Sequence, residues 1–358
     1  MNSSNLKAHF TKHTLVFKQA SGTSRGVLRK KASWFIIIKD EVTSKQGIGE
    51  CGLLRGLSVD DWSTYEITLQ KVCDDISNYR WWIEEGLLEF PSIQFGLEMA
   101  IQDLKSQDHI LFPSAFTEGE KSIPINGLIW MGTEDFMRQQ IEDKLEQGFD
   151  CVKMKIGAID FETEIALLKN IRKRFSKDTI ELRVDANGAF QVGEDALSKL
   201  NTLAKLDIHS IEQPIRQGQI EAMRDLCKIT PLPIALDEEL IGIFEKEKKQ
   251  ALIRVIQPQY IILKPSLVGG FRGSQEWMDA AAEYDIPWWI TSALESNIGL
   301  SAIAQWTHTL QNPMHQGLGT GSLYTNNFPS PLFIKNGALH HDKNGKWDLS
   351  LLKNEVAS

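Results

Sequence analysis

The sequence predicts an α/β protein whose larger part is a parallel (β/α) barrel, preceded by a smaller α+β domain. From Ile123 onward, short apolar strands and amphipathic helices alternate through eight candidate strands, as expected for a parallel barrel. Charged residues also follow several of these strands at nearly constant intervals. A doubly wound open sheet is the structural alternative. The 358 residues suffice for about two domains and a large core.

The first part of the chain reads as an α+β segment of about 110 residues. Residues 33–39 (SWFIIIK) form a predicted strand, and residues 48–53 form a second. Residues 62–104 are predicted to be helical, with a break at Pro91. No low-complexity linker follows, so we expect this segment to pack against the barrel.

The remaining strands and helices follow from apolar patterning. The predicted strands are 123–128, 152–156, 180–185, 208–212, 234–237, 260–264, 288–291 and a weaker one at 316–318. The predicted helices are 161–175, 194–206, 220–229, 274–284 and 300–310.

Five charged residues lie at or near the ends of consecutive predicted strands: Lys155, Asp185, Glu212, Asp237 and Lys264. They are separated by 30, 27, 25 and 27 residues, about the length of one βα unit in a barrel of roughly 250 residues. Each is therefore predicted to lie at the same height, near the carboxyl-terminal rim where barrel enzymes carry their active sites.

Side-chain alternation along the strands supports this arrangement. The residues immediately before the five charged ones are apolar and are predicted to face the helix layer: Met154, Val184, Ile211, Leu236 and Leu263. The charged residues then point into the barrel. Lys153 lies two positions before Lys155, so it shares the inward face.

Three carboxylates at one barrel mouth repel one another and raise one another's pKa unless a cation lies among them. Oxygen-only ligands from Asp185, Glu212 and Asp237 suit a hard ion, with Mg²⁺ the first choice and Mn²⁺ the alternative. Open coordination positions would accept a substrate carboxylate and stabilise an enediolate.

A lysine acts as a base only if its pKa falls towards working pH. Lys153 as a like-charged neighbour, together with the metal, is predicted to lower the pKa of Lys155 to roughly 7–8. Lys264 is expected to approach from the opposite side of the mouth.

At these residues the sequence resembles the enolase superfamily, in its muconate-cycloisomerase-like branch, over nearly the whole chain. The motifs that carry the resemblance are Lys153-Met154-Lys155, Asp185-Ala186-Asn187, Ile211-Glu212-Gln213-Pro214, Ala235-Leu236-Asp237-Glu238 and Leu263-Lys264-Pro265. The resemblance implies a (β/α)7β TIM-like barrel at residues 121–324. It also implies a capping domain at residues 1–120, completed by about 325–358. Mg²⁺ on the three acids and acid/base lysines at the matching positions are implied as well.

Two further segments, Thr291-Ser292-Ala293-Leu294-Glu295-Ser296 and Gly317-Leu318-Gly319-Thr320-Gly321, resemble the o-succinylbenzoate synthases of menaquinone biosynthesis. This resemblance implies syn dehydration of 2-succinyl-6-hydroxy-2,4-cyclohexadiene-1-carboxylate through an enediolate. Lys155 would abstract the α proton and return it to the departing hydroxyl, while Lys264 would stabilise the enediolate. The substrate-binding candidates are Lys153, Asn187, Ser292, Ser296 and Gly317.

Other members of the superfamily remain alternatives. Dipeptide epimerases carry an acidic pair after the last strand, and residues 311–325 here contain no Asp or Glu. An N-acylamino-acid racemase or a muconate cycloisomerase shares the remaining machinery. A non-catalytic metal-binding sensor or partner subunit is the remote alternative.

Composition argues against several other classes. A net charge of -8 and a pI of about 5.6 give no basic face for nucleic acid, and Arg29-Lys30-Lys31 is expected to be a solvated strand end. No stretch approaches the roughly 20 apolar residues of a membrane span, and no signal core is evident at the N-terminus. We therefore expect a cytoplasmic enzyme whose partner is a small-molecule carboxylate.

Three local patterns are predicted to be structural. The four cysteines lack CxxC spacing and are expected to be reduced. The eight histidines show no HxH or HExxH pattern, which disfavours a zinc hydrolase, and His315 is expected to be structural. Residues 47–52 match GxGxxG formally, but no long helix follows. This segment is expected to be a turn and strand whose tip, with residues 22–25, closes over the substrate.

Overall fold

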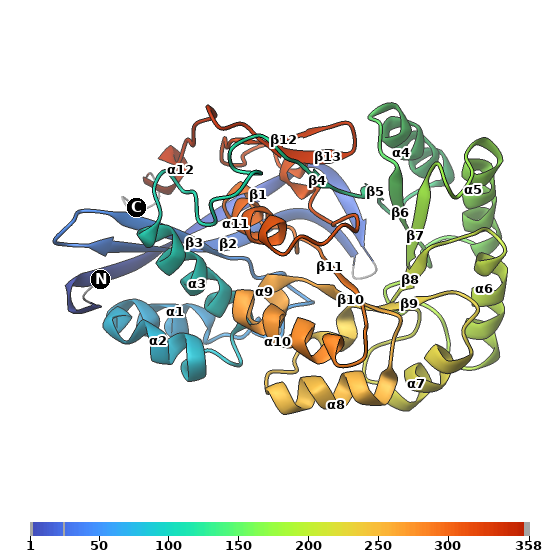
Figure 1. Ribbon diagram of the computed structural model, residues 1–358, viewed down its shortest axis with the longest axis horizontal. Coiled ribbons are helices and arrows are strands. Elements are labelled where there is room, and N and C mark those ends of the chain that lie inside the picture. Colours follow the sequence, from blue (N-terminus) through green and yellow to red (C-terminus); the bar gives the residue numbers. More distant parts are fainter. Residues whose placement is uncertain (1–2, 24–25, 354–358) are drawn as a thin grey trace.

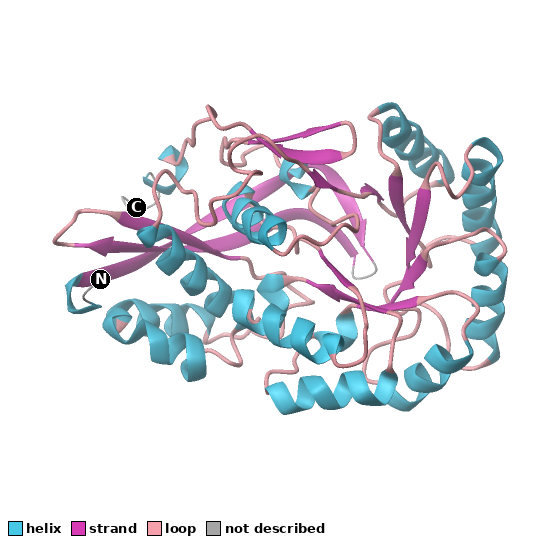
Figure 2. Ribbon diagram, in the orientation of Figure 1, coloured by secondary structure: helices cyan, strands magenta, loops and turns pink. Residues whose placement is uncertain are grey.

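A computed structural model describes residues 3–23 and 26–353. Its N-terminal part is a three-stranded antiparallel sheet of β1 (Leu6–Thr23), β2 (Gly26–Asp40) and β3 (Gln46–Cys51). Helices cover this sheet on one side, and a curled parallel sheet with an outer layer of helices forms the rest of the molecule (Figures 1 and 2). The predicted lid contribution of residues 22–25 falls partly outside the described residues.

In the N-terminal part, helix α3 (Pro91–Lys105) packs directly on β3. Pro91 occupies the first turn of α3, where its missing N–H is no loss. A Cβ at Gly47 would come within 2.1 Å of Ala100 O, and one at Gly49 within 1.9 Å of Gly96 O. These glycines are therefore required by the close approach of strand and helix, which accounts for the GxGxxG pattern structurally. The shorter elements are η1 (Ser3–Asn5), α1 (Tyr65–Asp74), η2 (Ile76–Asn78), α2 (Tyr79–Trp81) and η3 (Trp82–Gly86).

The parallel sheet has seven strands in consecutive order. They are β5 (Gly127–Ile129), β6 (Cys151–Lys155), β7 (Glu181–Asp185), β8 (Ser210–Glu212), β9 (Ile234–Leu236), β10 (Tyr260–Leu263) and β11 (Trp288–Ile290). The connecting helices are α4 (Glu134–Glu146), α5 (Phe161–Arg174), α6 (Glu194–Ala204), α7 (Ile220–Ile229), η4 (Glu238–Leu240), α8 (Lys246–Ile256), α9 (Pro265–Val268), α10 (Gly270–Ala282), α11 (Asn297–Thr309) and η5 (Thr320–Leu323). The prediction of an α/β fold with a curled parallel sheet is confirmed.

The seven ladders form an open half-barrel rather than an exact TIM barrel, because the predicted strand at 316–318 makes only isolated bridges. Gln316 pairs with Ile125 and Gly317 pairs with Thr291. Gln316 N donates to Pro124 O at 2.9 Å, and Gly317 N donates to Ile290 O at 2.8 Å. This closing segment, residues 315–317, therefore contacts both edges of the sheet.

The C-terminal segment contacts both parts of the molecule. Its hairpin of β12 (Leu332–Lys335) and β13 (Ala338–His341) pairs with β4 (Ile123–Pro124), and α12 (Ser350–Lys353) follows. Thr325 N donates to Val16 O of β1 at 2.9 Å. The division into a capping domain and a barrel stays a prediction.

The predicted alternation of side chains along the strands is confirmed by burial. The five apolar residues that precede the charged ones all lie in the main hydrophobic core. The solvated-strand prediction is wrong for Lys31, which is 4% exposed, whereas Arg29 and Lys30 are exposed. Strand alternation turns Lys31 to the inner face of β2. Among the described residues, every helix is too short or too polar to cross a membrane.

Candidate active site

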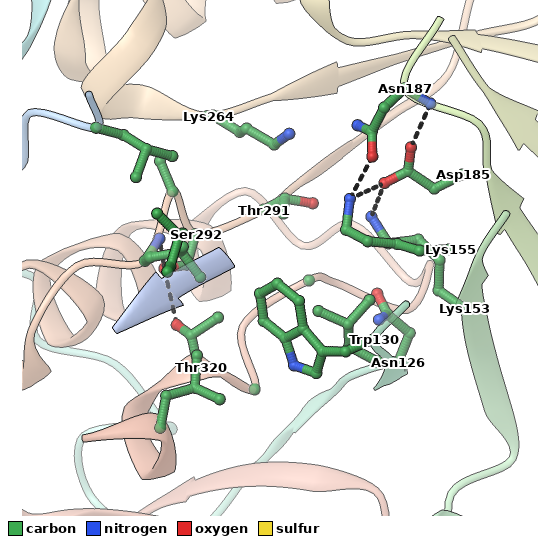
Figure 3. A pocket seen from close by; sticks show the side chains of 18 of the residues that line it. Asn126, Trp130, Lys153, Lys155, Asp185, Asn187, Lys264, Thr291, Ser292 and Thr320 are labelled. Atoms are coloured by element: carbon green, nitrogen blue, oxygen red, sulfur yellow. Dashed lines mark hydrogen bonds and ion pairs between the residues drawn. The ribbon is translucent and has the colours of Figure 1, made fainter. Parts of the chain in front are cut away.

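A cavity of about 220 Å³ lies at the carboxyl ends of the parallel strands, and Leu28 of β2 is part of its lining (Figure 3). Its polar lining includes Lys153, Lys155, Asp185, Asn187, Glu238, Lys264, Thr291, Ser292 and Gly317. Its apolar lining includes Leu28, Leu54, Leu57, Leu128, Trp130, Phe149, Leu294 and Leu323. Most of the residues singled out from the sequence therefore meet at one place.

The strand register produces this convergence. Lys155 pairs with Asp185, and Asp185 pairs with Glu212, across adjacent strands. Asp237 and Lys264 follow directly after β9 and β10. Glu212 and Asp237 are buried and do not line the cavity, so they lie beneath its surface. Figure 3 shows the ammonium ends of Lys155 and Lys264 extending toward each other from opposite sides.

Each of the three predicted metal ligands is paired with a lysine. Lys155 Nζ lies 2.7 Å from Asp185 Oδ2, and Lys153 Nζ lies 2.7 Å from Glu212 Oε2. Lys264 Nζ donates to Asp237 Oδ2 and lies 3.7 Å from Glu212 Oε1. Positive and negative side chains thus alternate in this cluster, and removing one charge changes the electrostatic environment of its neighbours.

Burial and mutual repulsion set the pKa directions in this cluster. Burial first, and then the Glu212 carboxylate, raise the pKa of Asp185. Burial raises the pKa of Asp237 well above its ordinary value, with only partial compensation by Lys264. Burial also opposes ionisation of Glu212, but Lys153 and Lys264 outweigh it and lower the pKa of that carboxyl. The carboxylates outweigh burial at Lys264 and raise its pKa. Asp185 and Asp237 therefore resist ionisation in this buried cluster, and an added cation would favour their charged forms.

The donor set fits a hard divalent cation. Four buried or partly buried carboxyl groups, the three predicted ligands and Glu238, face three lysines. Glu212 Oε1 is buried and makes no hydrogen bond to any described residue. Three oxygen donors on adjacent strands, one of them without a hydrogen bond, match the all-oxygen coordination that Mg²⁺ and Mn²⁺ prefer.

Asn187 connects the lysine to the acidic cluster. Its Oδ1 accepts from Lys155 Nζ at 2.7 Å, and its Nδ2 donates to Glu238 Oε1 at 3.0 Å. Asn187 adopts φ 45°, a left-handed conformation that Asn tolerates better than most residues. Glu238 was not among the residues predicted from the sequence, although an acid directly after Asp237 at a strand end was the available signal.

Ser292 lines the cavity, but its hydroxyl already makes all the hydrogen bonds that it can. Its Oγ donates to Glu295 Oε2 at 2.5 Å, and it accepts from Leu294 N at 3.2 Å and from Thr320 Oγ1 at 2.8 Å. One donor and two acceptor positions are the whole capacity of a hydroxyl. Ser292 therefore has no proton left for a substrate carboxylate.

The structure does not bring Ser296 to the cavity. Ser296 is buried, caps the start of α11 by accepting from Ile298 N, and donates its hydroxyl to Glu50 Oε2 at 2.5 Å. Gly317 does line the cavity, where a Cβ would come within 2.4 Å of Thr291 Oγ1. A glycine is thus needed there for Thr291 to pack against the closing segment.

Two polar atoms at the cavity were missed by the sequence analysis. Asn126 Oδ1 and Thr291 Oγ1 are buried and have no hydrogen-bond partner among the described residues, and both side chains line the cavity. Buried polar groups are normally paired, so these two atoms mark the wall where a polar ligand group is expected.

A buried ionic network joins the N-terminal sheet to this wall. Lys31 Nζ donates to Ser33 Oγ at 2.8 Å and lies 3.8 Å from Glu50 Oε1. Glu295, also within the electrostatic reach of Lys31, accepts from Ser266 and Ser292. We call Lys31, Glu50 and Glu295 the seam network. A Cβ on Gly52 of the N-terminal part would come within 3.1 Å of Glu295 Cγ.

Comparison with known proteins agrees with this geometry. A family model described as "Enolase C-terminal domain-like" matches residues 136–345. The chain therefore belongs to the enolase superfamily and is an enzyme of that class, as the motifs predicted.

Within the superfamily, an o-succinylbenzoate synthase of Desulfotalea psychrophila is 46% identical over 94% of this chain and 99% of that protein. The crystal structure of MenC from Desulfotalea psychrophila LSv54 has a TM-score of 0.82 at 43% identity, covering 94% of this chain and 99% of that one. A substrate-liganded L-Ala-D/L-Glu epimerase of Bacillus subtilis has a TM-score of 0.80 at 19% identity, covering 96% and 97%. That last likeness shows the shared fold alone.

Proposed function

We propose that this enzyme is an o-succinylbenzoate synthase, a carbon–oxygen lyase of menaquinone biosynthesis. Its substrate would be 2-succinyl-6-hydroxy-2,4-cyclohexadiene-1-carboxylate. One observation carries the proposal: two lysines extend into one cavity from opposite sides above three buried acids. The identity of 46% to an o-succinylbenzoate synthase supports this choice within the superfamily.

The reaction removes one proton and one hydroxide from adjacent carbons, so the products are the aromatic acid and water. Lys155 in its neutral form takes the α proton, and the resulting ammonium returns that proton to the departing hydroxyl on the same face. A single residue can serve both steps because the group leaves from the side on which the proton was taken. Lys264, with its pKa held high by the acids, keeps its charge and stabilises the enediolate electrostatically.

A divalent cation, Mg²⁺ in our proposal, would be held by Asp185, Glu212 and Asp237 and would supply positive charge opposite the substrate carboxylate. Lys155 must leave Asp185, which now lies 2.7 Å from it, before it can act as a base. Asn187, whose Oδ1 also lies 2.7 Å from the Lys155 Nζ, would then keep the amine oriented. Lys153, paired with Glu212 at 2.7 Å, would stay in place beside Lys155 on the inward face of β6.

The remaining cavity suits a ring with a polar arm. Trp130, Leu54 and Leu294 provide an apolar surface for the ring. The Thr291 hydroxyl, which lies in the wall without a partner among the described residues, and the Nδ2 donor of Asn126 are the groups we assign to the succinyl carboxylate, because a carboxylate only accepts hydrogen bonds. Ser292 would orient this wall through its bonds to Glu295 and Thr320 rather than bind the substrate itself.

Turnover of the succinylated diene acid tests the proposal. We expect formation of the aromatic product to stop with EDTA and to return with Mg²⁺. A panel of dipeptides and N-succinylamino acids, followed for epimerisation under the same conditions, provides the comparison. Epimerisation of a dipeptide with no dehydration would assign the chain to a different member of the superfamily. Binding of the diene acid without turnover would indicate a sensor.

A further inference from the structure

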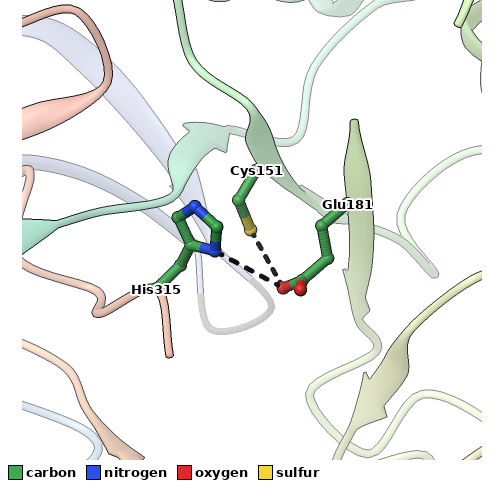
Figure 4. A group of neighbouring side chains, drawn as sticks. All are labelled: Cys151, Glu181 and His315. Atoms are coloured by element: carbon green, nitrogen blue, oxygen red, sulfur yellow. Dashed lines mark hydrogen bonds and ion pairs between the residues drawn. The ribbon is translucent and has the colours of Figure 1, made fainter. Parts of the chain in front are cut away.

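A second cluster of potential metal ligands lies at the opposite end of the strands from the cavity. Cys151 and Glu181 are the first residues of β6 and β7 and pair in register. His315 belongs to the closing segment of the sheet. One ligand atom from each of these three side chains lies within 4.8 Å of the other two, and Figure 4 shows the three converging.

The distances in this cluster approach those of a tetrahedral metal site. Cys151 Sγ lies 3.3 Å from Glu181 Oε1, and His315 Nδ1 lies 4.0 Å from the same oxygen. Zinc bond lengths of about 2.0–2.3 Å place neighbouring ligand atoms about 3.3–3.8 Å apart in a tetrahedron. The first distance already fits, and the second requires His315 to move by roughly half an ångström.

The histidine is oriented as a ligand would be. His315 Nε2 lies 2.9 Å from Asp150 Oδ1, and an ionised carboxylate only accepts hydrogen bonds. The ring proton of neutral His315 is therefore on Nε2, and the Nδ1 lone pair faces Glu181 and Cys151. Metal-binding histidines typically have this carboxylate partner on the second nitrogen. His209 Nε2 lies 4.0 Å from Glu181 Oε2 and is the residue we assign as a fourth ligand.

Arg183 contacts two members of this cluster. Its Nε donates to Glu181 Oε1 at 2.7 Å, its Nη1 donates to His315 O at 2.9 Å, and its guanidinium stacks on Trp289 at 4.3 Å. With a dication bound, the Cys151 thiolate and the Glu181 carboxylate would balance the charge of the metal. Ligating carboxylates are themselves commonly hydrogen-bonded, so the bond from Arg183 is compatible with metal binding.

We propose that Cys151, Glu181 and His315 form a second metal site, for a borderline dication such as Zn²⁺, on the amino-terminal face of the sheet. A sulfur, nitrogen and oxygen ligand set favours Zn²⁺ over Mg²⁺. Binding releases the thiol proton of Cys151 to solvent. Because the closing segment makes only isolated bridges to the sheet, a metal here would fasten it to β6 and β7. Its role would be structural, since the amino-terminal face of such folds serves stability.

Cobalt titration of the full chain with saturating Mg²⁺ tests the proposal. We expect one equivalent of Co²⁺ to give a thiolate-to-cobalt charge-transfer band, which the all-oxygen active site cannot produce. Zn²⁺ should abolish the band by displacement and raise the Tm. Cys151→Ser should lose the band, and the matched variant Cys227→Ser, which alters another buried free cysteine, should keep it.

His315→Gln provides a second test, because its side chain is partly exposed and its replacement carries little risk of misfolding. It should weaken Co²⁺ binding by more than the roughly 10- to 100-fold that loss of an outer-shell partner costs. Asp150→Asn, which alters that outer-shell partner, should fall within this range. Both variants should dehydrate substrate at the wild-type rate. No charge-transfer band in the wild type, or a band retained in both Cys151→Ser and His315→Gln, would overturn the proposal.

Discussion

Replacing Lys31 by methionine is the sharpest test of how the two parts of the molecule are joined. Lys31 is buried in the seam network, where its ammonium lies 3.8 Å from Glu50 and within electrostatic reach of Glu295. Methionine keeps an unbranched side chain one heavy atom shorter than that of lysine and removes the charge, which leaves two buried carboxyl groups without this cation.

The structure sets the size of the expected loss. Removing one partner of a buried ion pair costs about 3–5 kcal/mol. We expect the lower value, about 3 kcal/mol, for two reasons. Glu50 keeps hydrogen bonds from Ser33, Ser296 and Gly299. The pKa of Glu295 is already raised by burial, so that carboxyl can neutralise itself by binding a proton.

A double-mutant cycle with Glu50→Gln isolates the charge effect. The free energy of unfolding is measured by denaturant titration with Mg²⁺ present, for Lys31→Met, Glu50→Gln and the double variant. We expect the double variant to lose about 1–2 kcal/mol less unfolding free energy than the two single variants lose together, within the range for residues in contact. Additive losses, or a Lys31→Met variant within about 0.5 kcal/mol of wild type, would refute the account of the seam.

Three further predictions concern the metal, the substrate and pH. Asp237→Asn should weaken Mg²⁺ binding, measured by calorimetry, by at least the roughly 10- to 100-fold that an outer-shell change costs; unchanged affinity would mean that Asp237 is not a ligand. Thr291→Val should raise KM about tenfold, through loss of one charged hydrogen bond, while the control Ser322→Ala, at another residue that lines the cavity, stays near wild type; equal KM values would remove Thr291 from substrate binding. His109 lies 3.0 Å from Asp103, and that hydrogen bond raises the pKa of His109 despite opposition from burial. Because the folded pKa lies above the unfolded value of 6.5, the stabilisation is fully present below pH 6.5 and is lost as pH rises through the folded pKa. Unfolding free energy compared with His109→Gln across pH 5–8 checks this, and a difference that grows with pH would contradict it.

The active-site positions could be predicted because they follow from strand periodicity. Lys155, Asp185 and Glu212 sit at equivalent places on consecutive parallel strands, and register then brings them together without any knowledge of the loops. The spacing of βα units is set by chain geometry, so a sequence alone reveals it. The roles of these residues stay proposals.

Contacts between distant segments were not predictable in the same way. Lys31 looks like part of a solvated basic run until Glu50 and Glu295 are placed beside it. Ser292 and Ser296 both looked like substrate hydroxyls, yet each donates its proton to a different buried glutamate. Such pairings depend on how the N-terminal sheet docks on the parallel sheet, which local patterns do not encode.

The missed strand β1 has a related cause. Its sequence, LKAHFTKHTLVFKQASGT, alternates apolar residues with lysine and histidine, and its pairing with β2 along most of its length stabilises it. Pairing partners decide such strands more than intrinsic propensity does. At the closing segment the prediction was wrong in the opposite way, because a strand was expected there and only isolated bridges formed.

Hydrogen exchange at the α carbon of the substrate probes the proposed base directly. In D₂O with saturating Mg²⁺, Lys155→Ala should show no deuterium incorporation into the succinylated diene acid, while it stays folded and still binds Mg²⁺. Exchange that persists in this folded, metal-binding variant would contradict the assignment of Lys155 as the group that removes the proton.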